Sequence, residues 1–307
     1  MARQETVVFR DFPLRTPLHR FFSNGADPGD LLKSLFGRSQ EATAKIGPRQ
    51  RRTTLRIHEI VDVWAHQREQ IAANDVYFRT SKLNRAFDFA AITDFNVLHT
   101  GSAALKNLEI ATVLMGSPGC MTDSHSDDPD GCNHCVFGKK LWLAWDRLEG
   151  QARGLEDCEY DNVRTRARFD LRTFASLRSA HWFIVSRGHT LFMPGHLTHK
   201  VITLEKYLGV SAFYVTLPNA LSSLTRWHLN GAIYFKKAMW NDVAFAVRAQ
   251  LDTVAAGPRE AKHRWGFYHL GEALQAWERR HTGPQRAQML SVRPFDEVAE
   301  RIASYSH

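Results

Sequence analysis

Two histidine-containing segments, far apart in the chain, constrain this sequence most. In the first, at 121–140, His125 and Asp127 are two residues apart, so on an extended segment both side chains point the same way. In the second, at 191–203, a Pro-Gly turn precedes His199 and another apolar stretch. Two imidazoles and one carboxylate are the ligand set of many non-haem Fe(II) centres. A fold that uses all three ligands must bring the two segments together.

The His-x-Asp pair by itself carries little information. The chain contains 15 His, so one or two pairs of a histidine and an acidic residue at this spacing are expected by chance. Three further features support a site. Thr122 precedes the pair, a strand-like segment at 136–145 follows it, and the Pro-Gly turn comes a strand or two later.

Taken together, these features resemble the JmjC family of Fe(II)- and 2-oxoglutarate-dependent oxygenases. The core of that family reads Thr-x-x-His-x-Asp, then Gly-x-Lys at the start of a strand, then Pro-x-Gly-x-x-His-x-Val, and the likeness covers about residues 107–218. The resemblance implies that His125, Asp127 and His199 bind iron. The family's phasing, with Val201 after the third ligand, favours His199 over the nearby His196.

The resemblance also implies a site for 2-oxoglutarate. Lys140 falls on the family's co-substrate lysine, and Thr122 falls on the hydroxyl that helps it to hold the distal carboxylate. The most similar demethylase branch has a tyrosine before a histidine at this point, whereas this chain has Asn133 before His134. The contact of this position with 2-oxoglutarate is therefore expected to be altered or absent. The expected cofactor is Fe(II), with 2-oxoglutarate and molecular oxygen as co-substrates.

The apolar segments predict a jelly-roll, or double-stranded β-helix, because they are short and separated by tight turns. The expected strands lie at 6–9, 76–80, 107–115, 136–145, 182–185, 190–193 and 207–215. Apolar residues at helical spacing predict helices elsewhere. These lie at 31–36, 55–73, 220–249 and within 262–280, with one more at 169–177 in a polar insertion. A short helix or turn is expected at 87–95.

We therefore expect a mainly β fold with flanking helices. It divides into an N-terminal arm with helices that pack on the core (1–95), a JmjC double-stranded β-helix core (96–218) and a C-terminal helical region (219–307). The C-terminal helices are a candidate surface for a homodimer.

The chain carries a formal net charge of +8, which favours an anionic partner. Arginines cluster at 164–168 and in a polar stretch that contains Arg49, Arg51, Arg52 and Arg56. The latter stretch predicts either a nuclear-localisation or nucleic-acid patch, which would contact DNA or a nucleosome, or a surface loop. Neither a membrane-spanning apolar run nor a signal-peptide pattern is found, so an intracellular protein is expected. The arginine stretch and the demethylase-like motifs favour a nuclear location, with a cytoplasmic one as the alternative.

Three of the four cysteines, Cys120, Cys132 and Cys135, lie near the predicted site. Cys132 and Cys135 have the C-x-x-C spacing of a zinc half-site, whose other half would come from Cys120 or Cys158. Buried thiols are the simpler interpretation.

Three functions fit this pattern. The first is a JmjC histone lysine demethylase, which the motifs and the basic charge favour. The second is a JmjC hydroxylase of a protein or RNA side chain, which Asn133 and the lack of an evident chromatin-reader module favour. The third is a chromatin adaptor with weak or no activity. A histone tail or another protein is the expected partner.

Overall fold

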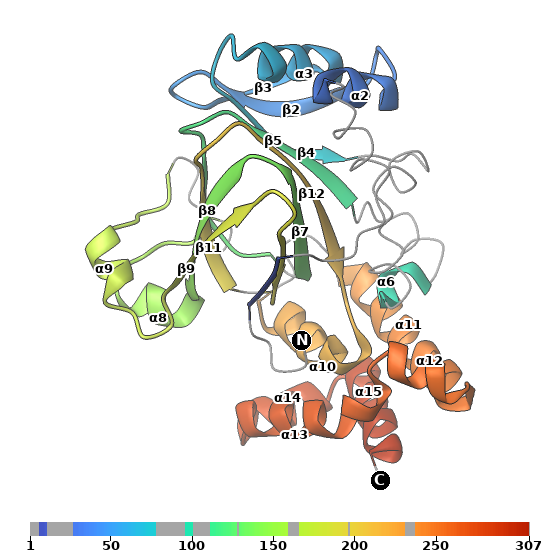
Figure 1. The fold of residues 1–307 in the computed structure, drawn as a ribbon. Coiled ribbons are helices and arrows are strands. Elements are labelled where there is room, and N and C mark those ends of the chain that lie inside the picture. Colours follow the sequence, from blue (N-terminus) through green and yellow to red (C-terminus); the bar gives the residue numbers. More distant parts are fainter. Residues whose placement is uncertain are drawn as a thin grey trace.

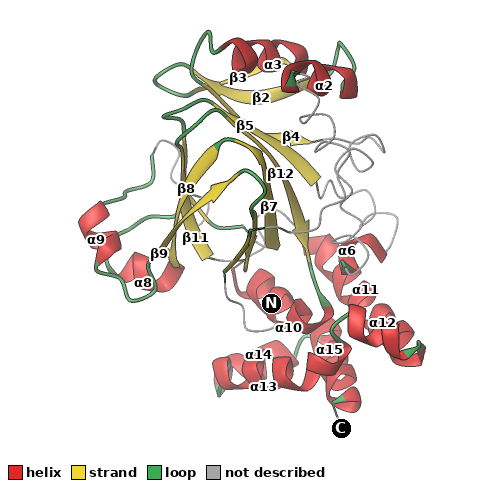
Figure 2. Ribbon diagram, viewed as in Figure 1, coloured by secondary structure: helices red, strands yellow, loops and turns green. Residues whose placement is uncertain are grey.

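The computed structural model describes residues 6–10, 27–77, 96–100, 111–127, 129–158, 166–195, 197–230 and 237–306. In this part of the chain two antiparallel sheets lie at the centre, and helices flank them (Figures 1 and 2). The architecture is mixed α/β and not mainly β as expected, because the helices form layers of their own at both ends of the sheets.

The larger sheet has eight strands and the smaller sheet has four. In spatial order, the larger sheet contains β1 (Val7–Phe9), β10 (Thr190–Met193), β7 (Asp130–Phe137), β12 (Tyr207–Tyr214), β5 (Ala111–Gly116), β4 (Ile71–Tyr77), β2 (Glu41–Ile46) and β3 (Arg51–Arg56). The smaller sheet contains β6 (Met121–His125), β11 (Leu197–Thr203), β8 (Lys139–Asp146) and β9 (His181–Ser186).

One apolar cluster joins the inner faces of the two sheets. The larger sheet contributes Leu114, Cys135, Leu191, Met193 and Tyr207, and the smaller sheet contributes Trp142, Val185 and Val201. Because successive side chains of a strand point to opposite faces, the same strands also bury residues on their outer sides.

Helices α2 (Pro28–Leu35) and α3 (Ile57–His66) cover the outer face of the larger sheet, at the top of Figure 1. The apolar residues of α3 recur at helical spacing, and its Trp64 is completely buried in this cluster. The helix ends where Gln67 adopts a left-handed conformation with φ 49°. The predicted helix at 55–73 is therefore too long, since its last residues belong to β4, where Ile71 is buried in the sheet.

The arginine-rich segment forms part of a hairpin. β3 pairs with β2 along its whole length and is the edge strand of the larger sheet. The loop interpretation is therefore wrong for Arg51 to Arg56. Arg49, Arg51, Arg52 and Arg56 are all exposed.

The insertion at 146–178 packs on the outer face of the smaller sheet. It contains α8 (Arg147–Ala152) and α9 (Leu171–Ala175), and the buried residues of this layer are Leu143, Trp145, Leu155, Phe174 and Leu177. α9 begins after Asp170, whose carboxylate accepts a hydrogen bond from the Thr173 N–H, and it ends at Ala175. It is therefore shorter than the helix predicted at 169–177. Arg164, in the second arginine cluster, lies outside the described residues.

The C-terminal helices form a layer of their own, at the bottom of Figure 1. They are α10 (Leu217–Asn230), α11 (Lys237–Ala256), α12 (Arg259–Arg264), the 3-10 helix η1 (Phe267–His269), α13 (Leu270–Arg280), α14 (Pro284–Leu290) and α15 (Arg293–Tyr305), and the short α6 (Val97–Thr100) packs against α11. The predicted helix at 220–249 falls on α10 and α11, and 231–236 lie outside the described residues. Even the longest helix described here lacks the apolar length to cross a membrane.

Two expectations stay untested. The predicted helix or turn at 87–95 lies outside the described residues. The domain division at 95 and 218 stays a prediction, although β2, β3 and β4 join the same sheet as β5.

Candidate metal centre

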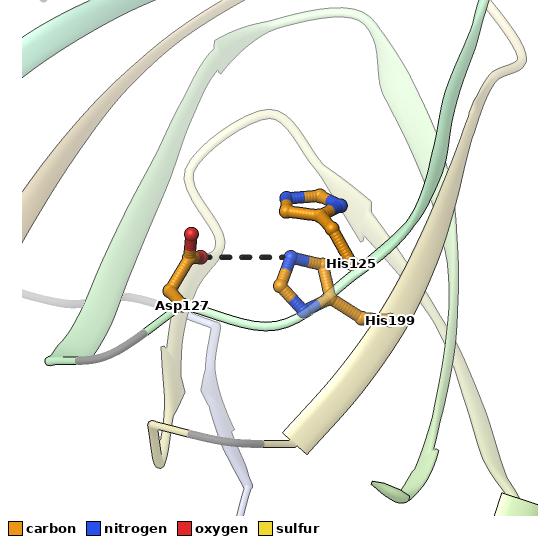
Figure 3. Close-up of side chains that lie close together, drawn as sticks. All are labelled: His125, Asp127 and His199. Carbon is orange, nitrogen blue, oxygen red and sulfur yellow. Dashed lines mark ion pairs between the residues drawn. The ribbon is translucent and has the colours of Figure 1, made fainter. Parts of the chain in front are cut away.

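His125, Asp127 and His199 converge at one edge of the smaller sheet (Figure 3). His125 is the last residue of β6, and His199 lies directly opposite it on β11. Each of the three residues offers a ligand atom, and these atoms all lie within 4.8 Å of one another. His199 Nε2 is 3.7 Å from Asp127 Oδ2. Since a bound ion holds such atoms at about 2.1 Å, small side-chain rotations are enough to close the set around one ion.

Backbone carbonyls fix the orientation of both imidazoles. His125 Nδ1 is 2.7 Å from the Asp123 carbonyl oxygen, and His199 Nδ1 is 3.0 Å from the Leu197 carbonyl oxygen. A carbonyl can only accept a hydrogen bond, so each Nδ1 carries a proton, and Nε2 is the nitrogen of each ring that can bind a metal. Burial, and then the neighbouring His125, lower the pKa of His199 to about 3, so this ligand is neutral at physiological pH.

A β-bulge brings Thr122 to the same face as the ligands. His199 pairs with His125, but Val201, two residues further along β11, pairs with Thr122, three residues back along β6. Directly paired residues of antiparallel strands share a face, so the extra residue in β6 turns Thr122 toward the side of His125. In a regular strand the spacing of three would place these two side chains on opposite faces.

Lys140 also shares this face. In the pairing of β8 with β11, Ala144 lies opposite His199, Trp142 opposite Val201, and Lys140 opposite Thr203. Gly138 makes the turn that opens β8 with φ 83°, and a Cβ atom there would collide with the Lys206 carbonyl.

The Lys140 ammonium is buried between the two sheets. The residue is 3% exposed, its Nζ lies 4.4 Å from the centre of the Tyr207 ring on the larger sheet, and it forms no ion pair within the described residues. Burial lowers the pKa of Lys140 to about 8. A buried cation that forms no ion pair with any described residue is a candidate receptor for an anionic group.

Asn133 lies beside Tyr207, which sequence reasoning missed. The Tyr207 hydroxyl donates a hydrogen bond of 2.6 Å to Asn133 Oδ1, and both residues are buried. Burial raises the pKa of Tyr207, so it stays a donor. A tyrosine ring thus contacts Lys140 from β12, while Asn133 on β7 accepts the hydrogen bond of its hydroxyl. The available signal was a tyrosine at the start of a buried strand, whose hydroxyl needs a partner.

Trp142 lies on the face of β8 that also carries Lys140, and it contacts one of the ligands. Its ring stacks on His199 at 5.4 Å between centroids and on Phe183 at 6.4 Å. Its indole N–H is buried and has no hydrogen-bond partner among the described residues. Trp145, three residues later, faces the insertion, so the two tryptophans lie on opposite faces of the smaller sheet, as their odd spacing on one strand requires.

The structure does not support a zinc half-site at Cys132 and Cys135. Cys132 packs in the cluster on the outer face of the larger sheet, and Cys135 packs between the sheets. Two thiols on opposite faces of one strand cannot bind the same ion. Burial raises the pKa of Cys135 to about 12, so the thiol stays protonated. Within the described residues, His125, Asp127 and His199 are the single group of three potential metal ligands.

His196, the competing third ligand, lies outside the described residues. Neither the models of protein families nor the curated proteins contain a match to this chain.

Proposed function

We propose that this protein is an Fe(II)- and 2-oxoglutarate-dependent dioxygenase with a JmjC-type double-stranded β-helix. The observation that carries the proposal is that a His-Asp-His set lies on one face of one sheet together with a buried lysine that has no ion pair among the described residues. Two packed antiparallel sheets, one of which holds these ligands, support the jelly-roll assignment.

The donor set fits iron. Two imidazoles whose Nδ1 atoms bond to backbone carbonyls, which leaves Nε2 for the metal, and one carboxylate form a facial set with open coordination positions. When bound, Fe(II) with 2-oxoglutarate and oxygen supplies an oxidant for a C–H bond, while 2-oxoglutarate is converted to succinate and carbon dioxide.

The chain's own residues supply binding and orientation. Lys140 offers a cation for the distal carboxylate of 2-oxoglutarate. Tyr207 offers a hydroxyl group beside Lys140, and Thr122 offers one on the face that carries the ligands. Trp142, which stacks on His199, and the apolar cluster between the sheets surround the site with apolar side chains, which limits the access of water.

For the substrate we propose an N-methyl-lysine of a histone tail, on the basis of the motifs and of the basic surface. Oxidation of an N-methyl group releases formaldehyde and completes a demethylation. The exposed β3 strand supports a contact with the DNA of a nucleosome that carries this tail. Arg52 lies directly opposite Lys45 on the adjacent β2, and like charges in this position repel each other unless an anion such as a DNA phosphate lies nearby. A nuclear location accords with such a partner.

A protein or RNA side-chain hydroxylase is the second candidate, since Asn133 bonds to Tyr207 in place of the tyrosine found in the demethylase branch. A chromatin adaptor without turnover is the third.

One assay separates the three candidates. Iron-loaded protein is incubated with 2-oxoglutarate and methyl-lysine histone peptides, with His125→Ala as control. Formaldehyde together with succinate supports the demethylase. Succinate with a product heavier by one oxygen atom supports the hydroxylase. No succinate with any substrate, at full iron occupancy, supports the adaptor.

A further inference from the structure

A buried carboxylate from the insertion lies behind the metal ligands. Asp157 is 1% exposed and follows α8 in the chain. Its Oδ2 accepts a hydrogen bond from the Ser126 hydroxyl and another, of 3.1 Å, from the Thr198 hydroxyl. The two hydroxyl oxygens are themselves 3.0 Å apart, and both residues are buried. One carboxylate oxygen is thus shared by two segments that are distant in sequence.

Both of these segments carry ligands. Ser126 lies between His125 and Asp127, and Thr198 immediately precedes His199. β6 ends at His125, so the sheet ladder does not hold Asp127. The insertion also pairs with β6 through its backbone, because the Cys158 N–H donates a hydrogen bond of 2.8 Å to the Ser124 carbonyl.

We infer that Asp157 is a positioning residue, which holds Asp127 and His199 at the spacing that one metal ion requires. This inference rests on the proposed metal centre and extends it to the insertion. A ligand set that is already in place loses less conformational freedom when the ion binds, so removing its support weakens the metal affinity.

The experiment is a titration of full-length apoprotein with Co(II), followed by visible absorption, for the wild type and for Asp157→Ala. Outer-shell support of this kind is worth roughly ten- to hundredfold in metal affinity, and we expect Asp157→Ala to lose that factor. Asp157→Asn keeps an oxygen that accepts both hydrogen bonds, and should restore most of the affinity. Glu149→Ala is the matched control, since Glu149 also accepts hydrogen bonds within the insertion, from Arg178 and Ser179, away from the ligands.

A role in folding alone is separated by a second set of variants. Ser126→Ala with Thr198→Val removes both hydroxyls, and adding Asp157→Ala to this pair should lower the affinity no further if the carboxylate acts through them. These milder variants also serve if Asp157→Ala does not fold. Folded variants that bind Co(II) as tightly as the wild type would overturn the inference and leave the metal centre intact. A wild type that binds no Co(II) would overturn the proposed function and the inference with it.

Discussion

At the scale of single residues, Lys140 is the most informative group. Its ammonium is buried without an anionic partner among the described residues, and this lowers its pKa from 10.5 to about 8. Because the folded-state pKa is below the unfolded one, the protonated lysine destabilises the fold. The cost is complete below pH 8 and disappears as the pH rises toward 10.5. A protein tolerates such a cost where the charge binds a ligand.

We therefore predict opposite effects of Lys140→Met on stability and on binding. The unfolding free energy at pH 7 should rise by up to about 3 kcal/mol, because a buried charge without a counterion is removed. The 2-oxoglutarate affinity of the metal-loaded protein should fall tenfold or more, as measured by calorimetry.

Lys139→Met is the matched control, because Lys139 pairs at the surface with Glu205 at 2.6 Å. The wild-type affinity should also decline above about pH 8, where Lys140 loses its proton. An affinity that is unchanged in Lys140→Met would assign the carboxylate site to another residue.

A second prediction concerns the third ligand. His199→Ala should abolish binding of one Fe(II) per chain in anaerobic equilibrium dialysis, because it removes one of three convergent ligand atoms. His196→Ala, three residues earlier in the same segment, should bind iron like the wild type. The reverse result would exchange the two assignments.

At the scale of elements, strand register decides which side chains meet. The bulge in β6 turns Thr122 toward the ligands, and the pairing of β8 with β11 places Lys140 on their side. The same reasoning describes the β2–β3 hairpin, where Arg52 and Lys45 face each other at the edge of the larger sheet. Charged residues on an edge strand can also serve to prevent pairing with the edge of another sheet. Measuring anion binding distinguishes this role from recognition of a partner.

For this hairpin we predict binding to duplex DNA that weakens steeply with salt. Replacing both Arg51 and Arg52 by serine should lower the log-log salt slope by about one for each DNA phosphate that is no longer neutralised, measured by fluorescence anisotropy. Arg56→Ser is the control, because Arg56 already pairs with Glu59. Negligible DNA affinity at low salt would remove the argument for a chromatin partner and favour the hydroxylase.

At the scale of the whole molecule, a buried ion pair ties the helical layer to the sheets. Asp130, at the start of β7, is completely buried. Its carboxylate accepts hydrogen bonds from the Gly195 N–H at 2.9 Å, from Asn219 of α10 at 2.9 Å and from Arg226 of α10 at 3.1 Å. Gly195 lies in the turn that leads to His199, so α10 supports the strand that carries this ligand.

Asp130→Ala should therefore lower the free energy of unfolding by about 3 kcal/mol, because it removes a buried carboxylate and leaves the Arg226 guanidinium, whose side chain is 15% exposed, without its partner. Denaturant unfolding measures this change. Glu205→Ala removes the carboxylate of the exposed pair with Lys139 and should cost about 1 kcal/mol or less. Equal effects of the two substitutions would show that the link through Asp130 contributes little.

The sequence alone predicted what depends on local pattern. The spacing of His125 and Asp127, the apolar runs that form β5, β10 and β12, and the C-terminal helices follow from residue type and periodicity within a few turns of chain. Tertiary structure decided the rest. α3 ends at Gln67 because the next apolar residues are buried in the sheet, and the bulge that turns Thr122 is set by pairing with β11. The hydrogen bond between Asp157 and Ser126 joins residues 31 positions apart, and the one between Tyr207 and Asn133 joins residues 74 positions apart. Register, bulges and buried polar contacts depend on which distant strand lies alongside, and no local periodicity encodes that choice.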